Sequence, residues 1–412
     1  MDSLAVAQKQ NILVDELSRG EDISIISFVN TLILHAHAQR ASDIHIDPAL
    51  KEVKVRLRVD GVLEDACVCP KNIQNEVVAR IKVLAGLRTD EHQATQDGRF
   101  RFAFPDSDDH IDVRVSIVPT YHGENVVMRL LANQSGDYSL VDLGFSEEDR
   151  KKIEAAIKKP NGMVLSTGPT GSGKTTTLYT LLKMLSSAEI SIITIEDPIE
   201  YAVSDIEQIQ VNPRASLTFA NGLRSILRQD PDIIMVGEIR DAETANIAVN
   251  TALTGHLLLS TLHTNDAATT LPRLLDMGID AYLVASTINI AIGQRLVRRV
   301  CKSCKEKSPV SEAEAASLAH VPLKEHVAEG EIFYRGKGCD QCNKTGYKGR
   351  LSINEVLVAD AAIREAIMRK ASSSELRDVA IAGGMTTMLE DGFRKVRAGE
   401  TTIEEVLRVV HE

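Results

Sequence analysis

The sequence feature that most limits the possible folds is a phosphate-loop pattern, Gly-x-x-x-x-Gly-Lys-Thr, set between an apolar run and a helical run. The pattern consists of Gly168, Pro169, Thr170, Gly171, Ser172, Gly173, Lys174 and Thr175. Residues 163–165 are typical of a short buried strand, and residues 175–182 predict a helix. The order strand, loop, helix indicates an α/β domain, because a helix N-terminus after the loop completes an anion site.

The residue types in the loop fit a nucleoside triphosphate. The glycines allow backbone N–H groups to close around phosphate oxygens, and Lys174 reaches the β and γ phosphates. We expect the Thr175 hydroxyl to bind Mg²⁺ and Thr176 to belong to the same nucleotide-binding set. ATP and Mg²⁺ are therefore the expected cofactors of this loop, and a chance glycine-rich turn is the alternative.

The order and spacing of the apolar segments predict several structural regions. Strands expected at 163–167, 190–195, 232–236 and 256–262 alternate with helices, which favours a parallel, RecA-like sheet. Earlier segments alternate apolar and charged residues and indicate an α+β domain. We therefore divide the chain into a remnant or linker (1–20), an α+β domain (21–132), a linker (133–145), a RecA-like core (146–297), a four-cysteine insertion (298–350) and a helical C-terminal region (351–412).

Composition narrows the class of protein. The formal net charge is −11, and aromatic residues make up only 4% of the chain, with no Trp. Both values argue against a general nucleic-acid coat that stacks bases on aromatic rings. The start of the chain lacks the features of a secretory signal, and no apolar run reaches the length of a membrane span. We expect a cytoplasmic protein that reaches a membrane only through partners.

Four of the six cysteines form two Cys-x-x-Cys pairs. The pairs are Cys301 with Cys304 and Cys339 with Cys342, and together they supply four thiolates for a structural Zn²⁺ site. Four unliganded thiols are the alternative. Cys67 and Cys69 lie on one side of an expected strand, and we interpret them as small core side chains.

Carboxylates at the ends of strands near the loop are candidates for catalysis, because phosphoryl transfer requires a positioned water and charge neutralisation. Glu196 and Glu200 end one apolar strand, and Glu238 ends another. Gly237 stands where many phosphate-loop enzymes carry an aspartate linked to Mg²⁺. We therefore expect Glu238 to act through water on Mg²⁺ or on the γ-phosphate. Exposed strand-end acids without a catalytic role are the alternative.

Two histidines and several arginines are further candidates. His256 and His263 flank the run 257–262, so they lie at opposite ends of this expected strand. We expect one of them, His263, to sense the γ-phosphate. An ordinary hydrogen-bonding role is the alternative. Arg114 and Arg129 alternate with apolar strand residues, and we expect them to meet phosphates bound by a neighbouring subunit. A solvated face with surface ion pairs remains open for both.

These motifs together resemble the secretion ATPase superfamily that powers type II secretion and type IV pilus assembly. The resemblance is carried by the phosphate loop and by the segments 195–201, 227–241, 254–265, 40–46 and 119–124. It implies a homo-hexameric ring in which a PAS-like domain preceding the core moves over the nucleotide of the next subunit. It also implies that Glu200 and Glu238 are the catalytic carboxylates. The four cysteines are similar to those of the assembly and secretion branch.

The resemblance implies an ATPase that works on an inner-membrane platform protein, together with associated cytoplasmic assembly proteins and without direct contact to nucleic acid. A DNA-transfer or conjugation motor of the same superfamily is the alternative, and a nucleotide-occupied scaffold without turnover is a third reading. Relatives of this branch usually carry a further N-terminal docking domain. We therefore expect either a truncated chain or docking through other surfaces.

Overall fold

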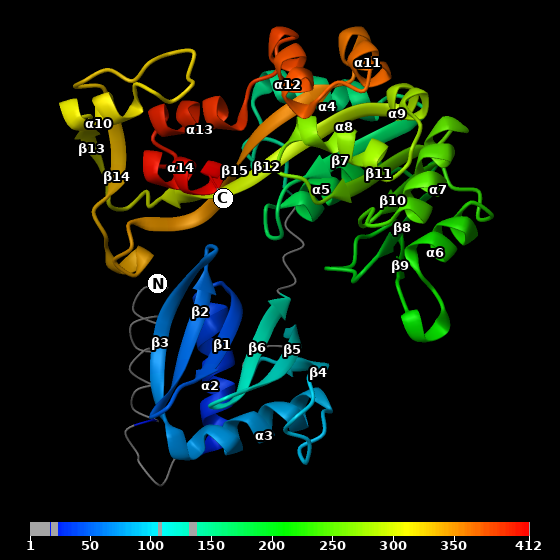
Figure 1. The fold of residues 1–412 in the computed structure, drawn as a ribbon. Helices are drawn as coiled ribbons and strands as arrows, with labels where there is room; N and C mark the ends of the chain where they lie inside the picture. Colours follow the sequence, from blue (N-terminus) through cyan, green and yellow to red (C-terminus); the bar gives the residue numbers. More distant parts are fainter. Residues whose placement is uncertain (1–16, 18–23, 106–108, 132–137, 412) are drawn as a thin grey trace. The chain divides into compact units, whose positions relative to one another are not determined.

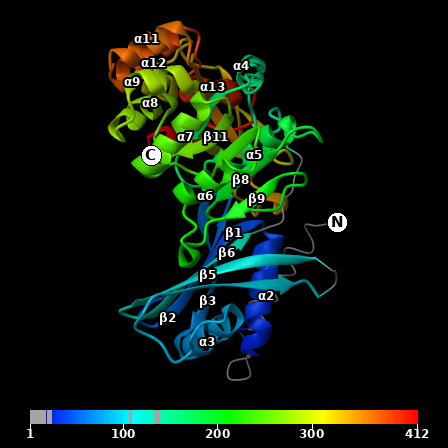
Figure 2. The same ribbon diagram turned by 90° about the vertical axis from the view of Figure 1, so that its right-hand side faces the viewer.

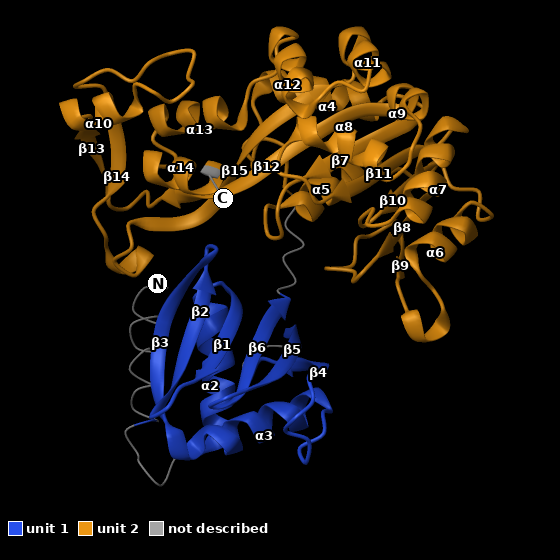
Figure 3. Ribbon diagram, in the orientation of Figure 1, with its two compact units in different colours: residues 1–134 blue, residues 135–412 orange. Residues whose placement is uncertain are grey.

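The computed structural model describes residue 17 and residues 24–105, 109–131 and 138–411, in two compact units. Unit 1 comprises residues 1–134 and unit 2 residues 135–412 (Figure 3). Residues 133–137 of the expected linker, and the expected remnant at 1–20 apart from Leu17, lie outside the described residues. Within the described ranges, no helix is both long and apolar enough to span a bilayer.

In its described residues, unit 1 is a six-stranded antiparallel sheet of order β3-β2-β1-β6-β5-β4 with the helices α2 and α3 on one face (Figures 1 and 2). Its elements are α2 (Ile25–Ala38), β1 (Ala41–Pro48), β2 (Glu52–Val59), β3 (Val62–Pro70), α3 (Gln74–Ala85), β4 (Gln96–Ala103), β5 (His110–Thr120) and β6 (Gly123–Leu131). Alternate strand residues such as Ile44 and Val113 pack against Phe28 and Val77 of the helices. The charged residues between them therefore lie on the face of the sheet opposite α2 and α3.

Unit 2 contains a seven-stranded sheet of order β15-β12-β7-β11-β10-β8-β9, in which only the β12–β15 pair is antiparallel. Its strands are β7 (Gly162–Thr167), β8 (Ile192–Glu196), β9 (Glu207–Gln210), β10 (Ile233–Val236), β11 (Leu257–Leu262), β12 (Ile288–Val300) and β15 (Tyr347–Val358). This parallel arrangement confirms the expected RecA-like sheet. The strand limits differ from the expected ones by no more than two residues.

Helices cover both faces of this sheet, which explains why its strands are apolar runs rather than alternating patterns. One face carries α6 (Phe219–Ile226), α7 (Ala242–Leu253), α8 (Ala267–Asp276), α9 (Ala281–Thr287), α11 (Ala361–Met368) and α12 (Ser373–Ala382). The other carries α4 (Glu147–Ile157) and α5 (Lys174–Leu185). Helix α4 begins with three acidic residues in its first turn, and the Ser146 hydroxyl before it accepts a hydrogen bond from the Asp149 N–H.

The cysteine segment is continuous with the large sheet. The antiparallel pair β12–β15 continues to Val300 opposite Tyr347, so the expected limits at 298 and 350 fall inside these two strands. Beyond them lie the hairpin of β13 (Lys305–Pro309) and β14 (Ile332–Gly336) with α10 (Glu312–Leu318) (Figure 1). Phe333 of this segment shares a core with Phe393 and Val406 of α13 (Met388–Arg397) and α14 (Ile403–His411).

Candidate functional site

The phosphate loop connects β7 to α5 at the carboxyl end of the parallel sheet. Gly168, Gly171 and Gly173 have φ values of 143°, 80° and 90°, a region that residues with a side chain rarely adopt. A Cβ on Gly168 would also lie 2.3 Å from the carbonyl oxygen of Gln294. The backbone conformation therefore favours glycine at all three positions, and the close approach of β12 adds a steric requirement at Gly168.

The Lys174 side chain is buried and folds back onto the phosphate loop. Its Nζ donates to the carbonyl oxygens of Gly168 and Pro169, at 2.8 and 2.9 Å. Burial lowers the pKa of Lys174 to about 8, while the nearby Glu238 opposes that shift. Among the residues that the structure describes, none forms a hydrogen bond with the buried hydroxyl of Ser172. A buried ammonium, an unpaired hydroxyl and a helix N-terminus together fit a phosphate group.

The remaining loop residues differ in exposure. Pro169, Thr170 and Gly171 form an exposed tip, whereas Thr175 and Thr176 lie half-buried in the first turn of α5. The hydroxyl-bearing residues at the start of α5 are therefore partly accessible beside the loop.

Glu238 lies two residues after the end of β10 and is almost fully buried. Its Oε1 lies 2.5 Å from a guanidinium nitrogen of Arg240, and its Oε2 lies 3.3 Å from Nε2 of His263. No hydrogen bond to this Oε2 is formed by the described residues. A Cβ on Gly237 would lie 3.3 Å from the Cα of Glu196, so the glycine allows the ends of β8 and β10 to approach closely.

Contacts between strand ends bring His263 to Glu238. Thr261 donates to the carbonyl oxygen of Gly237 at 2.7 Å, and the Thr264 N–H donates to the hydroxyl of Thr167 at 3.1 Å. The loop after β11 is thus tied both to the phosphate-loop strand and to the strand of Glu238. His256 lies before β11, with Nδ1 3.3 Å from the Thr251 carbonyl oxygen, at the opposite end of the sheet.

Glu196 and Glu200 occupy different environments. Glu196 is 2% exposed and accepts hydrogen bonds from Tyr179, from Thr194 at 2.6 Å and from Gln208 at 3.2 Å. Burial raises the pKa of Glu196, and these donors oppose the rise. Glu200 is exposed in the loop after β8, and its backbone is hydrogen-bonded to the Tyr179 hydroxyl. The buried network therefore supports the backbone of the loop that carries Glu200.

The two candidate arginines lie in unit 1, on the face of the sheet opposite α2 and α3. Arg114 of β5 is directly opposite Arg129 of β6, and Arg129 Nε donates to Asp43 at 3.0 Å. The structure brings these two arginines together and leaves the guanidinium of Arg129 mostly exposed.

Several residues of the site escaped the sequence analysis. Arg240 pairs with Glu238, Tyr179 and Gln208 complete the network of Glu196, and Gln294 accepts from Thr177 of α5 at 2.9 Å. Gln294 is 1% exposed within an apolar strand. A polar residue in such a run is a signal that could have identified it, because buried amides require partners.

The four cysteines of the insertion form one cluster. Their Sγ atoms all lie within 4.8 Å of one another, with Cys301 and Cys339 at 3.9 Å and Cys304 and Cys342 at 3.8 Å. Backbone N–H groups of Cys339 and Gly346 also donate to Cys342 Sγ. Four convergent soft ligands fit a closed tetrahedral Zn²⁺ site. Cys67 and Cys69 instead pack against the core of unit 1, as expected.

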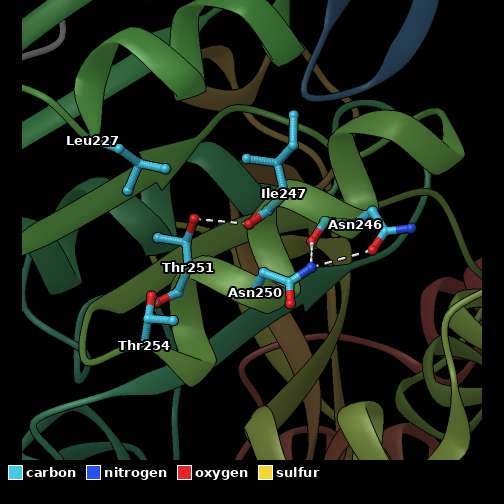
Figure 4. A pocket seen from close by; sticks show the side chains of 6 residues that line it. All are labelled: Leu227, Asn246, Ile247, Asn250, Thr251 and Thr254. Atoms are coloured by element: carbon cyan, nitrogen blue, oxygen red, sulfur yellow. Dashed lines mark hydrogen bonds between the residues drawn. The ribbon is translucent and has the colours of Figure 1, made fainter.

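A separate pocket of about 380 Å³ lies beside α7 and the end of α6 (Figure 4). It is lined by Leu227, Asn246, Ile247, Asn250, Thr251 and Thr254. Thr251 also accepts from His256, which places this end of α7 at the amino end of β11. The lining has no charged group to bind a phosphate, and the pocket is not part of the phosphate-loop site.

Comparisons with known proteins agree with this geometry. A family model described as "Type II/IV secretion system protein" matches residues 18–408. The type II secretion system protein E of Xanthomonas campestris is 48% identical over 393 residues, which cover 95% of this chain and 68% of that protein. The type IV pilus assembly ATPase PilB of Thermus thermophilus is 47% identical over 381 residues, which cover 92% of this chain but only 42% of PilB.

Two solved structures share the fold. The Legionella pneumophila ATPase DotB matches with a TM-score of 0.67 and 22% identity, covering 93% of this chain and 95% of DotB. The pilus retraction motor PilT with bound ADP matches with a TM-score of 0.60 and 24% identity, covering 92% of this chain and 96% of PilT.

Proposed function

Since this chain belongs to the type II/IV secretion system protein family, with its type II secretion and type IV pilus assembly ATPases, we propose that it hydrolyses ATP in a Mg²⁺-dependent reaction. The observation that carries the proposal is the position of Glu238. Its buried carboxylate lies just beyond the carboxyl end of β10, close enough to Lys174 to shift the pKa of that lysine. A carboxylate and a phosphate-binding lysine at one sheet edge are the minimal parts of such a site.

Each residue has a distinct role in this proposal. Backbone N–H groups of the loop and Lys174 bind the β and γ phosphates, and Glu238 holds the attacking water and accepts its proton. His263, beside Glu238, responds to the γ-phosphate. Glu200, on the loop above Tyr179, is the second catalytic carboxylate. Mg²⁺ held by Thr175 would neutralise charge on the phosphates. Glu196 supports the Glu200 loop from the core, rather than meeting the nucleotide.

We extend the proposal to the assembly. The chain forms a homo-hexamer in which Arg114 and Arg129 of one copy neutralise phosphate charge at the site of another. The ring drives type IV pilus assembly or type II protein secretion through an inner-membrane platform protein, and it reaches the membrane through this partner and cytoplasmic assembly proteins. A zinc ion in the cysteine cluster would lock the two Cys-x-x-Cys turns together.

The test compares two glutamates that follow β10. Glu238→Gln should lower the rate of ATP hydrolysis about 100-fold or more while nucleotide affinity changes little, because the carboxylate acts on the water rather than on bound phosphates. Glu243→Gln is the matched control, since Glu243 pairs with Arg224 on the exposed start of α7. Removal of Mg²⁺ by a chelator should abolish ATP hydrolysis by both variants. Unchanged turnover of Glu238→Gln would remove this residue from the mechanism.

A further inference from the structure

Strand register places five charged residues in one line across unit 1. Arg99 of β4 is opposite Arg114 of β5, Arg114 is opposite Arg129 of β6, Arg129 is opposite Asp43 of β1, and Asp43 is opposite Arg58 of β2. Opposed residues of neighbouring strands point to the same face of a sheet. The row therefore contains four guanidinium groups and one carboxylate, all on the face of the sheet opposite α2 and α3.

Asp43 is the acidic residue of this row, and it contacts the arginines on either side of it. It is only 5% exposed, although it lies on the polar face. Its Oδ1 accepts from Arg129 Nε at 3.0 Å, and its Oδ2 lies 3.7 Å from Arg58 Nε and accepts from Ser42 at 2.8 Å. The side chain of Arg129 is 56% exposed. The carboxylate thus lies at the sheet surface, and the guanidinium of Arg129 extends from it toward solvent.

This contact fixes the orientation of the guanidinium. A hydrogen bond from Nε restricts rotation of the planar group and leaves its terminal amino groups to bind another acceptor. Like charges directly opposite one another in a sheet destabilise it. Arg99, Arg114 and Arg129 occupy three consecutive register positions, so an anion with several oxygens, such as a triphosphate, would relieve their repulsion.

We propose that Asp43 is a positioning residue for Arg129 and that it sets the direction in which this arginine meets the terminal phosphate of ATP bound to a second copy of the chain. The inference rests on the proposed function, in which Arg129 acts in trans. Asp43 itself does not touch the nucleotide. Its effect on turnover passes through the orientation of Arg129.

The chain offers a closely matched control. Asp47 lies on the same strand and the same face, and its Oδ2 pairs with Arg56 through Nε and a terminal nitrogen, both at 2.8 Å. Asp43→Ala should lower kcat about 10-fold while KM stays within about 2-fold, because misplacement of a transition-state group affects chemistry more than binding. Asp43→Asn, which keeps an acceptor oxygen and nearly the same shape, should lose less. Asp47→Ala should hydrolyse ATP at the wild-type rate.

A double-mutant cycle separates positioning from a structural role. With Arg129→Ala already present, Asp43→Ala should cause no further loss of kcat, although its effect on the thermal midpoint should persist. An additive loss, or an equal loss in Asp47→Ala, would overturn the inference. If Arg129→Ala alone keeps wild-type turnover, the role of that arginine in trans fails. If Arg129→Ala is impaired while Asp43→Ala and Asp43→Asn are fully active, only the role of Asp43 fails.

Discussion

Arg240 and Glu238, two residues apart in the chain, form an ion pair in which the carboxylate is buried and the guanidinium is mostly exposed. The pair holds one oxygen of Glu238 and leaves the other beside His263. The carboxylate is therefore oriented from one side only. This geometry suits a group that must hold a water molecule with its second oxygen.

Arg240→Ala should lower kcat about 10-fold with little change in nucleotide affinity, because the buried carboxylate then loses the donor that orients it. The measurement is steady-state ATP hydrolysis together with equilibrium nucleotide binding. Arg224→Ala is the control, since Arg224 forms a similar pair with the exposed Glu243 at 2.7 Å. Equal losses in the two variants would contradict an orienting role for Arg240.

Nucleotide affinity should fall as the pH rises above about 8. Burial lowers the pKa of Lys174 to about 8, so the free protein loses this positive charge above that pH, whereas bound phosphate favours the charged form. Calorimetric titrations between pH 7.5 and 9.5 should show affinity falling by up to about tenfold per pH unit. Lys174→Arg should bind more weakly but without this dependence, because a guanidinium stays charged. An equal slope in both proteins would exclude Lys174 as its source.

The lowered pKa of Lys174 also predicts the direction in which folding stability changes with pH. The pKa of Lys174 in the folded chain is below its ordinary value of 10.5, so the unfolded chain binds more protons between about pH 8 and pH 10. The contribution of Lys174 to stability should therefore increase across that window. Urea titrations of wild-type and Lys174→Arg proteins should differ in this direction.

Tyr179→Phe should reduce kcat severalfold and lower the thermal midpoint, since the hydroxyl both donates to buried Glu196 and accepts from the backbone of Glu200. Tyr347→Phe is the control, because it removes a comparable hydroxyl contact, to Thr402 at 2.9 Å, outside the nucleotide site. A loss of stability in both variants with a loss of turnover in Tyr179→Phe alone is the expected result. Normal turnover of Tyr179→Phe would show that the hydrogen bonds of Tyr179 do not affect the role of Glu200 in catalysis.

Elemental analysis of protein purified without chelator should find about one Zn²⁺ per chain. Cys301→Ser should release the metal and accelerate amide hydrogen exchange over residues 301–346, because four ligands hold the two turns together. Cys67→Ser, outside the cluster, should keep full metal content. Near-normal ATPase activity in Cys301→Ser is compatible with a structural site, whereas wild-type protein without metal would refute it.

Mixing two inactive chains tests the arginines in trans. Arg114→Ala and Glu238→Gln should each be inactive alone, and mixed rings should regain part of the activity, because some interfaces pair an intact carboxylate with an intact arginine. Lys174→Ala in place of Glu238→Gln should give a similar rescue. Mixed rings that form without recovering activity would show that the arginine serves its own subunit.

The parts of the molecule that could be predicted from sequence are those encoded locally. The phosphate loop, the parallel strands and the cysteine pairs each depend on spacing within a short segment. The contact between Gln294 and Thr177 depends instead on β12 lying beside β7, an order that no local pattern specifies. Glu196 and Glu200 look alike in sequence, and only the packing of Tyr179 and Gln208 separates a buried support from an exposed acid.

The pairing of Val300 with Tyr347 makes the whole cysteine segment a loop inserted at the end of one hairpin. Removing residues 301–346 would leave two adjacent strand ends that a short turn could join, so the length of this region is free to vary without breaking the sheet order. The constraint lies in the core packing, because the cluster that contains Phe393 would lose Phe333. A shortened chain would keep its topology and would need a polar residue at position 393 to keep the newly opened surface from associating.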